Sequence, residues 1–169
     1  LIHHADWAAV SCIEEAIELR QQGFFKSILL LEGFFNFNEL PLIDEYQLTP
    51  VIRDRHQLEM LQKFNFKHYF SLWLKINTGM NRLGISPEQL SFFWHALNQL
   101  PKLNSSPVLM SHFSCADELE KEITTQQISL FKQILKQYPS PKSLSNSAGL
   151  IAWPDSHEDF VRPGLATYG

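Results

Sequence analysis

Cysteine, basic charge and long apolar runs are all scarce in this sequence of 169 residues. Two cysteines, Cys12 and Cys115, are too few for a disulfide framework and indicate reduced thiols. The 14 lysines and arginines are outnumbered by 18 acidic residues, which gives a formal net charge of −4. A basic field typical of nucleic-acid binding is therefore missing. No apolar run approaches the roughly 20 residues of a membrane span. We expect a cytoplasmic globular protein with neither nucleic acid nor membrane as a partner.

Several sequence motifs that indicate a particular chemistry are also missing. The seven histidines are scattered and no CxxC or HExxH spacing occurs, so we expect no metal site. There is no GxGxxG or P-loop for a nucleotide and no GxSxG nucleophile elbow. Any function must therefore be inferred from less specific patterns.

Short apolar runs do alternate with amphipathic helical segments along the whole chain. The helices include one ended by Gly23, one over residues 38–48, one begun by Ser86 with Gln89 in a capping box, and one preceded by a second box of Asp117 and Glu120. The predicted strands are residues 7–12, 27–31, 49–52, 68–76, 107–113, 142–147 and 160–168. Repeated strand–helix units predict a parallel sheet, either an open doubly wound sheet or a (β/α)₈ barrel.

Polar side chains recur where the predicted strands end. They are Glu32, Arg53, Lys75 with Asn77, His112, Asn146 with Ser147, and Arg162. A barrel gathers the carboxyl ends of its strands around one mouth, where these side chains would converge, whereas an open sheet would spread them along an edge. This pattern favours the barrel, although each residue alone could be an ordinary solvated side chain at the start of a loop.

The segment from Lys75 to Gly84 is the most informative stretch. It leaves an apolar strand, turns at Gly79 and delivers a cation at Arg82, which suits an anionic or phenolate oxygen. Lys75 is by itself a candidate for a Schiff-base lysine, although a structural role is commoner for an isolated lysine. His112 could act as an acid, a base or a ring partner, or be a buried structural histidine.

The last two predicted strands end in small residues that favour a phosphate. Ser147 offers a hydroxyl, and Gly164 lets the backbone approach a ligand closely. A phosphate site in barrels often follows strands seven and eight. A buried Arg162 would need an acceptor, while a surface Arg162 would need none.

Six stretches of the chain, in order, resemble the alanine racemase family of pyridoxal-phosphate enzymes. They are residues 12–16, 29–35, 73–84, 111–114 with 116–118, 145–148, and 161–164 with 168–169. The resemblance implies an incomplete TIM-barrel domain of α/β class over residues 1–169, with strands two to eight present. The first strand and the β-rich C-terminal domain of the family would then be missing.

The resemblance also implies a cofactor site for pyridoxal 5′-phosphate. Arg162 resembles the arginine that hydrogen-bonds the pyridine nitrogen, and His112 resembles its partner beside the ring. Arg82 resembles the arginine near the phenolic oxygen and the substrate carboxylate. Lys75 matches a lysine that is carbamylated in some members, which replaces its interpretation as a Schiff-base lysine. The family often has aspartate where this chain has Asn77. Residues similar to the phosphate cradle and its neighbour are Asn146, Ser147, Gly164 and Leu165.

Both catalytic bases of the family are absent from the sequence. The Schiff-base lysine of the first barrel strand and the opposing tyrosine of the partner subunit have no match here, so no catalytic residue is assigned. Because racemisation needs a base on each face of the Cα carbanion, we expect the chain alone to be inactive. The resemblance implies that the parent is a homodimer acting on alanine. The alternatives are another amino-acid racemase on the same barrel, or a non-catalytic fragment that binds a phosphate ligand or a protein.

Overall fold

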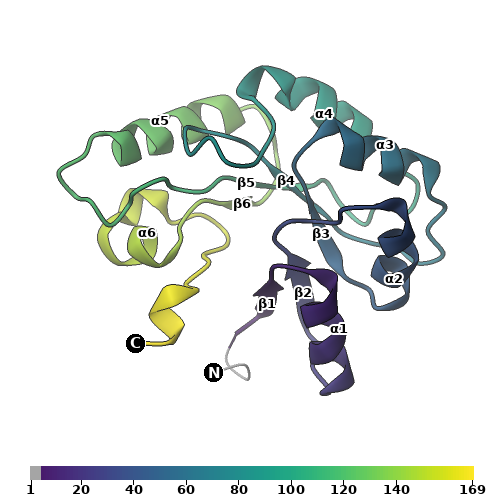
Figure 1. The fold of residues 1–169 in the computed structure, drawn as a ribbon. Coiled ribbons are helices and arrows are strands. Elements are labelled where there is room, and N and C mark those ends of the chain that lie inside the picture. Colours follow the sequence, from purple (N-terminus) through teal and green to yellow (C-terminus); the bar gives the residue numbers. More distant parts are fainter. Residues whose placement is uncertain (1–4) are drawn as a thin grey trace. The chain divides into compact units, whose positions relative to one another are not determined.

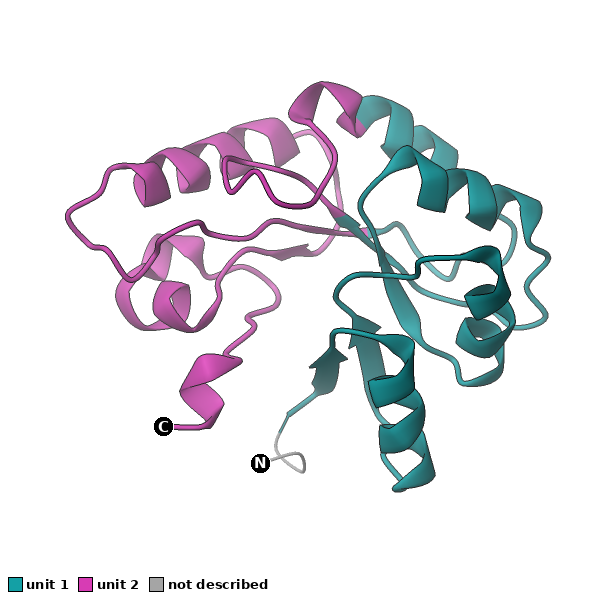
Figure 2. Ribbon diagram, viewed as in Figure 1, with its two compact units in different colours: residues 1–74, 91–107 teal, residues 75–90, 108–169 magenta. Residues whose placement is uncertain are grey.

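The computed structural model describes residues 5–169, which form two compact units. Unit 1 comprises the chain up to Leu74 together with Ser91–Pro107, and unit 2 comprises Lys75–Leu90 and Val108–Gly169 (Figure 2). No helix among the described residues is long and apolar enough to cross a membrane.

The helices and strands alternate along the chain, as the sequence predicts (Figure 1). The strands are β1 (Trp7–Val10), β2 (Ser27–Leu30), β3 (Thr49–Ile52), β4 (Trp73–Lys75), β5 (Val108–Met110) and β6 (Lys142–Ser143). The α-helices are α1 (Ile13–Gln21), α2 (Leu40–Glu45), α3 (Arg55–Lys63), α4 (Leu90–Asn98), α5 (Ile123–Leu135) and α6 (Ser147–Ala152). The 3₁₀-helices are η1 (Phe37–Glu39), η2 (Pro87–Gln89), η3 (Pro154–Ser156) and η4 (Leu165–Thr167).

In unit 1 the strands β1 to β4 pair in parallel, each with the next along the chain. Ala8 lies opposite Ile28, and Leu30 lies opposite Pro50. β2 and β3 carry almost only buried side chains, which is typical of parallel strands covered on both faces. Glycine ends α1 as expected, since Gly23 adopts a φ of +86° just beyond the helix.

In unit 2 the strands β5 and β6 are also parallel, with Leu109 opposite Lys142 and Met110 opposite Ser143. Figure 1 shows α5 running alongside these two strands. Phe131 and Leu135 of this helix are fully buried, as are Leu109 and Leu144. The capping interaction expected before η2 is present, because Ser86 N–H donates to Gln89 Oε1 at 3.1 Å.

The predicted strand over residues 160–168 is wrong. Only Phe160 forms a bridge, to Ser143, and residues 165–167 form η4. Pro163 has no N–H to donate to a ladder. Within the described part of the chain, backbone hydrogen bonds to the segment after β6 extend only to Arg162, whose N–H donates to the Ser145 carbonyl at 2.9 Å. Leu165 and Tyr168, beyond that point, are 79% and 88% exposed. Most other predicted strands are shorter in the structure, and the fourth begins at Trp73 instead of residue 68.

The predicted capping box of Asp117 and Glu120 is also wrong. Residues 115–121 form two successive turns, in which Glu118 N–H donates to the Cys115 carbonyl and Lys121 N–H to the Glu118 carbonyl. The helix begins only at Ile123, without a side-chain cap. The acidic residues therefore lie in a solvated loop before the helix.

Candidate functional site

The loop that follows β4 is shaped by the side chain of Asn77. Its Oδ1 atom accepts hydrogen bonds from the backbone N–H groups of Gly79 and Asn81, both at 3.0 Å. Asn81 adopts a φ of +59°, a left-handed conformation that asparagine tolerates well. The amide of Asn77 makes these contacts without a charge. The loop presents Arg82 as an exposed cation.

Glycine is required where this loop closes. Ile85 N–H donates to the Lys75 carbonyl at 2.9 Å, and Asn77 N–H donates to the Ile85 carbonyl at 2.8 Å. Gly84 lies between them with a φ of +119°, and a Cβ there would stand 2.9 Å from the Asn77 nitrogen. Any larger residue would force the backbone of the loop apart.

Three cations act on the charge state of His112, which lies two residues beyond the end of β5. Burial, and then the positive charges of Arg162, Lys75 and Arg82, lower the pKa of the His112 imidazole from 6.5 to about 4. His112 is therefore neutral at pH 7. Lys75 is itself buried, at 6% exposure. The structure thus brings four of the predicted site residues together in unit 2.

Arg162 is anchored by carbonyl and hydroxyl oxygens. Its guanidinium donates to the carbonyls of Ser111 at 2.6 Å and Leu144 at 3.1 Å, and to the hydroxyl of Ser143. Burial lowers the pKa of Arg162 to about 10, which leaves it protonated at neutral pH. Among the described residues, nothing accepts a hydrogen bond from its Nε–H and no carboxylate pairs with it. Three of the five N–H groups of this fixed cation are used, so the Nε–H and one Nη1–H remain for a ligand.

The predicted phosphate residues lie together where the start of α6 contacts η4. Ser147 Oγ accepts from Ala166 N–H at 2.9 Å, so its own hydroxyl hydrogen remains to donate. Asn146 caps α6 by accepting from Gly149 N–H at 2.9 Å. Gly164 N–H already donates to the Arg162 carbonyl, whereas no described residue accepts from Leu165 N–H. A Cβ at Gly164 would meet nothing within 4 Å, so this side of the segment is open.

Several residues of the site were not predicted from the sequence. Gln127 on α5 is buried and contacts both the loop of Thr78 and the segment at His112. The Thr78 hydroxyl lies 2.7 Å from that of Ser111, whose carbonyl binds Arg162. One signal was available, because Gln127 interrupts the apolar spacing of Ile123, Phe131 and Leu135. A polar residue on such a stripe indicates a buried hydrogen-bonding role.

Two of the strand-end residues lie in unit 1 and pair with each other. Arg53 Nη1 is 3.6 Å from Glu32 Oε2, and the Arg53 guanidinium lies 5.2 Å from the centre of the Phe35 ring. The predicted convergence is therefore seen within each unit, as an ion pair in unit 1 and as a cationic cluster in unit 2.

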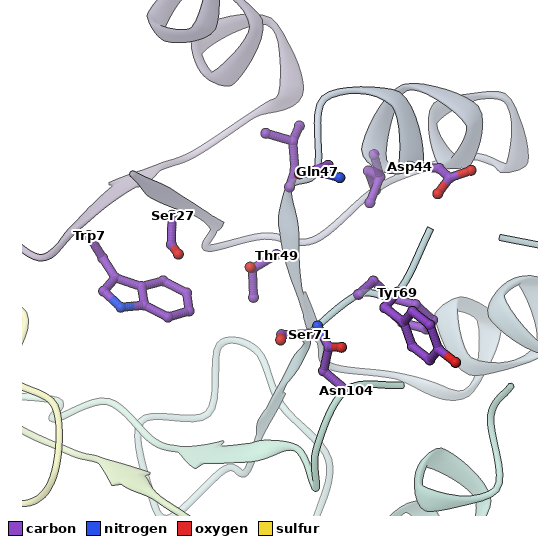
Figure 3. A pocket seen from close by; sticks show the side chains of 11 residues that line it. Trp7, Ser27, Asp44, Gln47, Thr49, Tyr69, Ser71 and Asn104 are labelled. Atoms are coloured by element: carbon purple, nitrogen blue, oxygen red, sulfur yellow. The ribbon is translucent and has the colours of Figure 1, made fainter. Parts of the chain in front are cut away.

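A cavity of about 220 Å³ in unit 1 lies at the amino ends of its strands, away from their carboxyl ends. Figure 3 shows Trp7, Ser27 and Thr49 lining it, and each of these residues begins a strand. None of the predicted cofactor residues lines this cavity. Ligands of parallel α/β folds bind at the carboxyl ends of the strands, so the cavity is not the cofactor site.

Parallel strands with connecting helices define an α/β domain, and its strand ends carry cationic and hydroxyl groups. The whole chain, residues 1–169, matches the family described as alanine racemase, N-terminal domain. The chain belongs to this family. The expected barrel class is confirmed by the similar solved structures, although the described residues form six strands and not the expected seven.

Named relatives agree in sequence and in structure. The alanine racemase of Vibrio parahaemolyticus is 43% identical over 167 residues, and that of Shewanella sp. strain MR-4 is 39% identical over 168. The structure of the biosynthetic alanine racemase from Pseudomonas aeruginosa superimposes with a TM-score of 0.94 at 37% identity. Each match covers 99% of this chain and 47% of the relative. The chain therefore spans about half the length of the curated relatives it matches.

Proposed function

We propose that this chain is the cofactor-binding part of an alanine racemase. The enzyme would interconvert L-alanine and D-alanine with pyridoxal 5′-phosphate in the cytoplasm, as a homodimer, and supply D-alanine for cell-wall peptidoglycan. The observation that carries the proposal is the cluster of Arg162, Lys75 and Arg82 around a neutral His112. The cluster presents an excess of positive charge, which suits a ligand with a phosphate, a phenolic oxygen and a carboxylate.

The donor set of unit 2 fits this cofactor at both ends. The Ser147 hydroxyl and the Leu165 N–H are available to a phosphate, and the open side of Gly164 leaves room for it. Asn146 holds the start of α6 beside them. At the other end, the Nε–H of Arg162 is available to a pyridine nitrogen. When bound, the cofactor supplies an electron-accepting ring that stabilises negative charge on the substrate Cα.

The residues around the ring control where protons are held. With a pKa of about 10, Arg162 keeps its protons at neutral pH, so it donates a hydrogen bond without protonating the ring nitrogen. Arg162 would thereby hold the ring nitrogen of the cofactor in its unprotonated form. His112 adds no charge beside Arg162 because it is neutral. Arg82 would bind the phenolic oxygen and the substrate carboxylate by charge-assisted hydrogen bonds.

We propose that Lys75 holds a carbamate in the working enzyme, formed when its neutral amine adds CO₂ and releases a proton. Its side chain is buried at 6% exposure, close enough to His112 for its charge to lower the pKa of the imidazole. A carbamate would replace this positive charge by a negative one among cations. That exchange would fix the guanidinium of Arg82 in the same loop.

A racemisation assay tests the proposed activity. The chain is incubated with L-alanine and pyridoxal phosphate, and D-alanine is measured by chiral chromatography. We expect no more D-alanine than the free cofactor produces, because neither base that exchanges the Cα proton is present. Enzyme-like turnover by the chain alone would contradict this expectation.

The same assay on a full-length protein that contains the chain tests the function itself. We expect racemisation of alanine, with kcat lowered about tenfold or more by Arg162→Ala, since one charge-assisted hydrogen bond contributes roughly 1.5–3 kcal/mol. A full-length protein that binds the cofactor but racemises a different amino acid would favour the alternative racemase. A full-length protein without any racemase activity would overturn the proposal.

A further inference from the structure

The carboxamide of Gln127 makes four hydrogen bonds, all to uncharged groups. The side chain is 1% exposed. Its Nε2 atom donates to the carbonyl of His112 at 3.0 Å and to the hydroxyl of Thr78 at 3.3 Å. Its Oε1 atom accepts from Ser114 N–H at 3.1 Å and from the Ser114 hydroxyl at 3.2 Å. One side chain on α5 thus joins the loop after β4 to the segment after β5.

These contacts reach the residues that the proposed function assigns to the cofactor. The backbone of His112 is held directly. Thr78 and Gly79 lie in the loop that presents Arg82, and the chain passes so close to Gln127 that a Cβ at Gly79 would stand 3.5 Å from its Cγ. Thr78 also contacts the hydroxyl of Ser111, whose carbonyl accepts from Arg162. The positions of His112, of the loop that presents Arg82 and of Arg162 therefore depend on one hydrogen-bonded network.

The same arrangement, a buried helix glutamine hydrogen-bonded to two strand-end loops, occurs independently in unit 1. Gln57 of α3 is 2% exposed, and its Oε1 atom accepts from Arg53 N–H at 2.9 Å at the end of β3. Its Nε2 atom donates to the carbonyls of Glu32 at 3.1 Å and Phe34 at 2.8 Å, after the neighbouring strand β2. A glycine, Gly33, again lies against the glutamine with a φ of +71°. The repetition indicates that a helix glutamine fixes adjacent strand-end loops in this fold.

We propose that Gln127 is a positioning residue of the cofactor site, which sets the spacing between the Arg82 loop and His112. The inference rests on the proposed function for what the site binds. An amide is needed because the network requires a donor toward His112 and an acceptor toward Ser114 at the same place. Gln127 touches neither cofactor nor substrate and would act only through the residues it holds.

Three variants separate positioning from packing. Gln127→Met keeps the length of the side chain and removes the hydrogen bonds. Gln57→Met makes the same change in unit 1, which contains none of the proposed cofactor residues, and Gln126→Met makes it at an exposed neighbour on α5. Unfolding in urea, followed for all three, reports the packing cost of each substitution.

Two readouts report the geometry of the site in the chain itself. One is the pKa of His112 from NMR titration, which depends on its burial and on Arg162, Lys75 and Arg82. The other is the calorimetric Kd for N-(5′-phosphopyridoxyl)-L-alanine, a stable conjugate of cofactor and substrate without an aldehyde. For Gln127→Met we expect a Kd raised about tenfold or more and a His112 pKa displaced toward 6.5. The two control variants should leave both quantities unchanged within about twofold in Kd.

The outcomes decide between the claims. The inference is overturned if Gln127→Met retains the Kd and the His112 titration of the unsubstituted chain, or if Gln57→Met changes them equally. If the unsubstituted chain does not bind the conjugate, the proposed function fails, and the His112 titration alone decides the role of Gln127.

Gln127→Glu serves if Gln127→Met does not fold. Its carboxylate keeps the acceptor toward Ser114 but cannot donate to the His112 carbonyl, and burial raises its pKa. Binding relative to the unsubstituted chain should therefore be weak at about pH 8 and recover toward about pH 5, where the protonated acid donates again. A pH-independent ratio would overturn the positioning role.

Discussion

The neutrality of His112 comes from two effects that act in the same direction. Burial disfavours the imidazolium, and the cations Arg162, Lys75 and Arg82 disfavour it further. A protonated His112 would add a fourth positive charge beside Arg162. It would then compete with Arg162 for the same hydrogen-bond acceptor of the ligand. The folded chain thus avoids this charge at the pH where the proposed cofactor would bind.

The lowered pKa of His112 predicts a loss of stability in acid. The unfolded histidine takes up a proton near pH 6.5 while the folded one does so only near pH 4. Stability from this residue is therefore complete above about pH 6.5 and is lost as the pH falls to about 4, by about 3 kcal/mol at most. Urea unfolding of the unsubstituted chain and of His112→Gln at pH 7 and pH 4.5 measures the difference. Equal losses of stability between pH 7 and pH 4.5 in the unsubstituted chain and in His112→Gln would contradict the prediction. His95→Gln, at an exposed histidine, is the control and should lose as much stability as the unsubstituted chain.

Two glycines of the site should respond in opposite ways to alanine. Gly84→Ala forces a Cβ to within 2.9 Å of Asn77 at a φ of +119°, so we expect a loss of about 2 kcal/mol or more in the free energy of unfolding.

Gly164→Ala meets nothing within 4 Å at a φ of −59°, so stability should change by less than about 0.5 kcal/mol. Its Cβ would still enter the proposed phosphate cradle and weaken binding of pyridoxal phosphate. Urea unfolding and cofactor titration separate the two effects, and undiminished binding by Gly164→Ala would exclude Gly164 from the cradle.

At the scale of elements, α3 depends on its amino-terminal cap. Asp54 adopts an extended conformation and its Oδ1 accepts from Gln57 N–H at 2.9 Å. This cap also fixes the start of the helix that bears Gln57, whose side chain holds the loops after β2 and β3. A local sequence feature thus helps to define the strand-end geometry of unit 1.

Removal of this cap predicts a measurable loss of stability. Asp54→Ala should lower the free energy of unfolding by about 1 kcal/mol, because one N–H of the first turn loses its acceptor. Asp54→Asn should be nearly neutral, since the amide oxygen can accept the same hydrogen bond. Unfolding in urea measures both, and equal losses for alanine and asparagine would show that charge, not capping, is what Asp54 contributes.

Elements encoded by local contacts were predictable from the sequence. Buried apolar strands such as β2 and the helix begun by Ser86 follow from residues adjacent in the chain. The strand expected at residues 160–168 does not form, because an extended segment needs a neighbouring strand along its length, and backbone hydrogen bonds to residues 142–145 are made only by Phe160 and Arg162. The box at Asp117 was mistaken for a helix start because the same residues also suit a turn.

The candidate site was predictable to a similar degree. Strand-end residues such as His112 and Arg162 are visible as polar positions after apolar runs. Gln127 was missed because its partners are separated from it by 13 to 49 residues in the chain. The low pKa of His112 likewise depends on the charges of Lys75 at the end of β4, of Arg82 in the loop after it, and of Arg162 far along the chain.

At the scale of the whole molecule, the chain matches about half the length of its relatives and holds the proposed cofactor residues in unit 2. Their arrangement depends on α5 and on the loops after β4, β5 and β6. The central claim is that this cluster binds the cofactor through Arg162.

Calorimetric titration of the chain with N-(5′-phosphopyridoxyl)-L-alanine tests this claim most directly. We predict one bound conjugate per chain and a Kd raised about tenfold or more by Arg162→Ala. Arg55→Ala, an exposed arginine of α3 in unit 1, is the matched control and should bind as the unsubstituted chain does. Absence of binding by the unsubstituted chain, or undiminished binding by Arg162→Ala, would contradict the account.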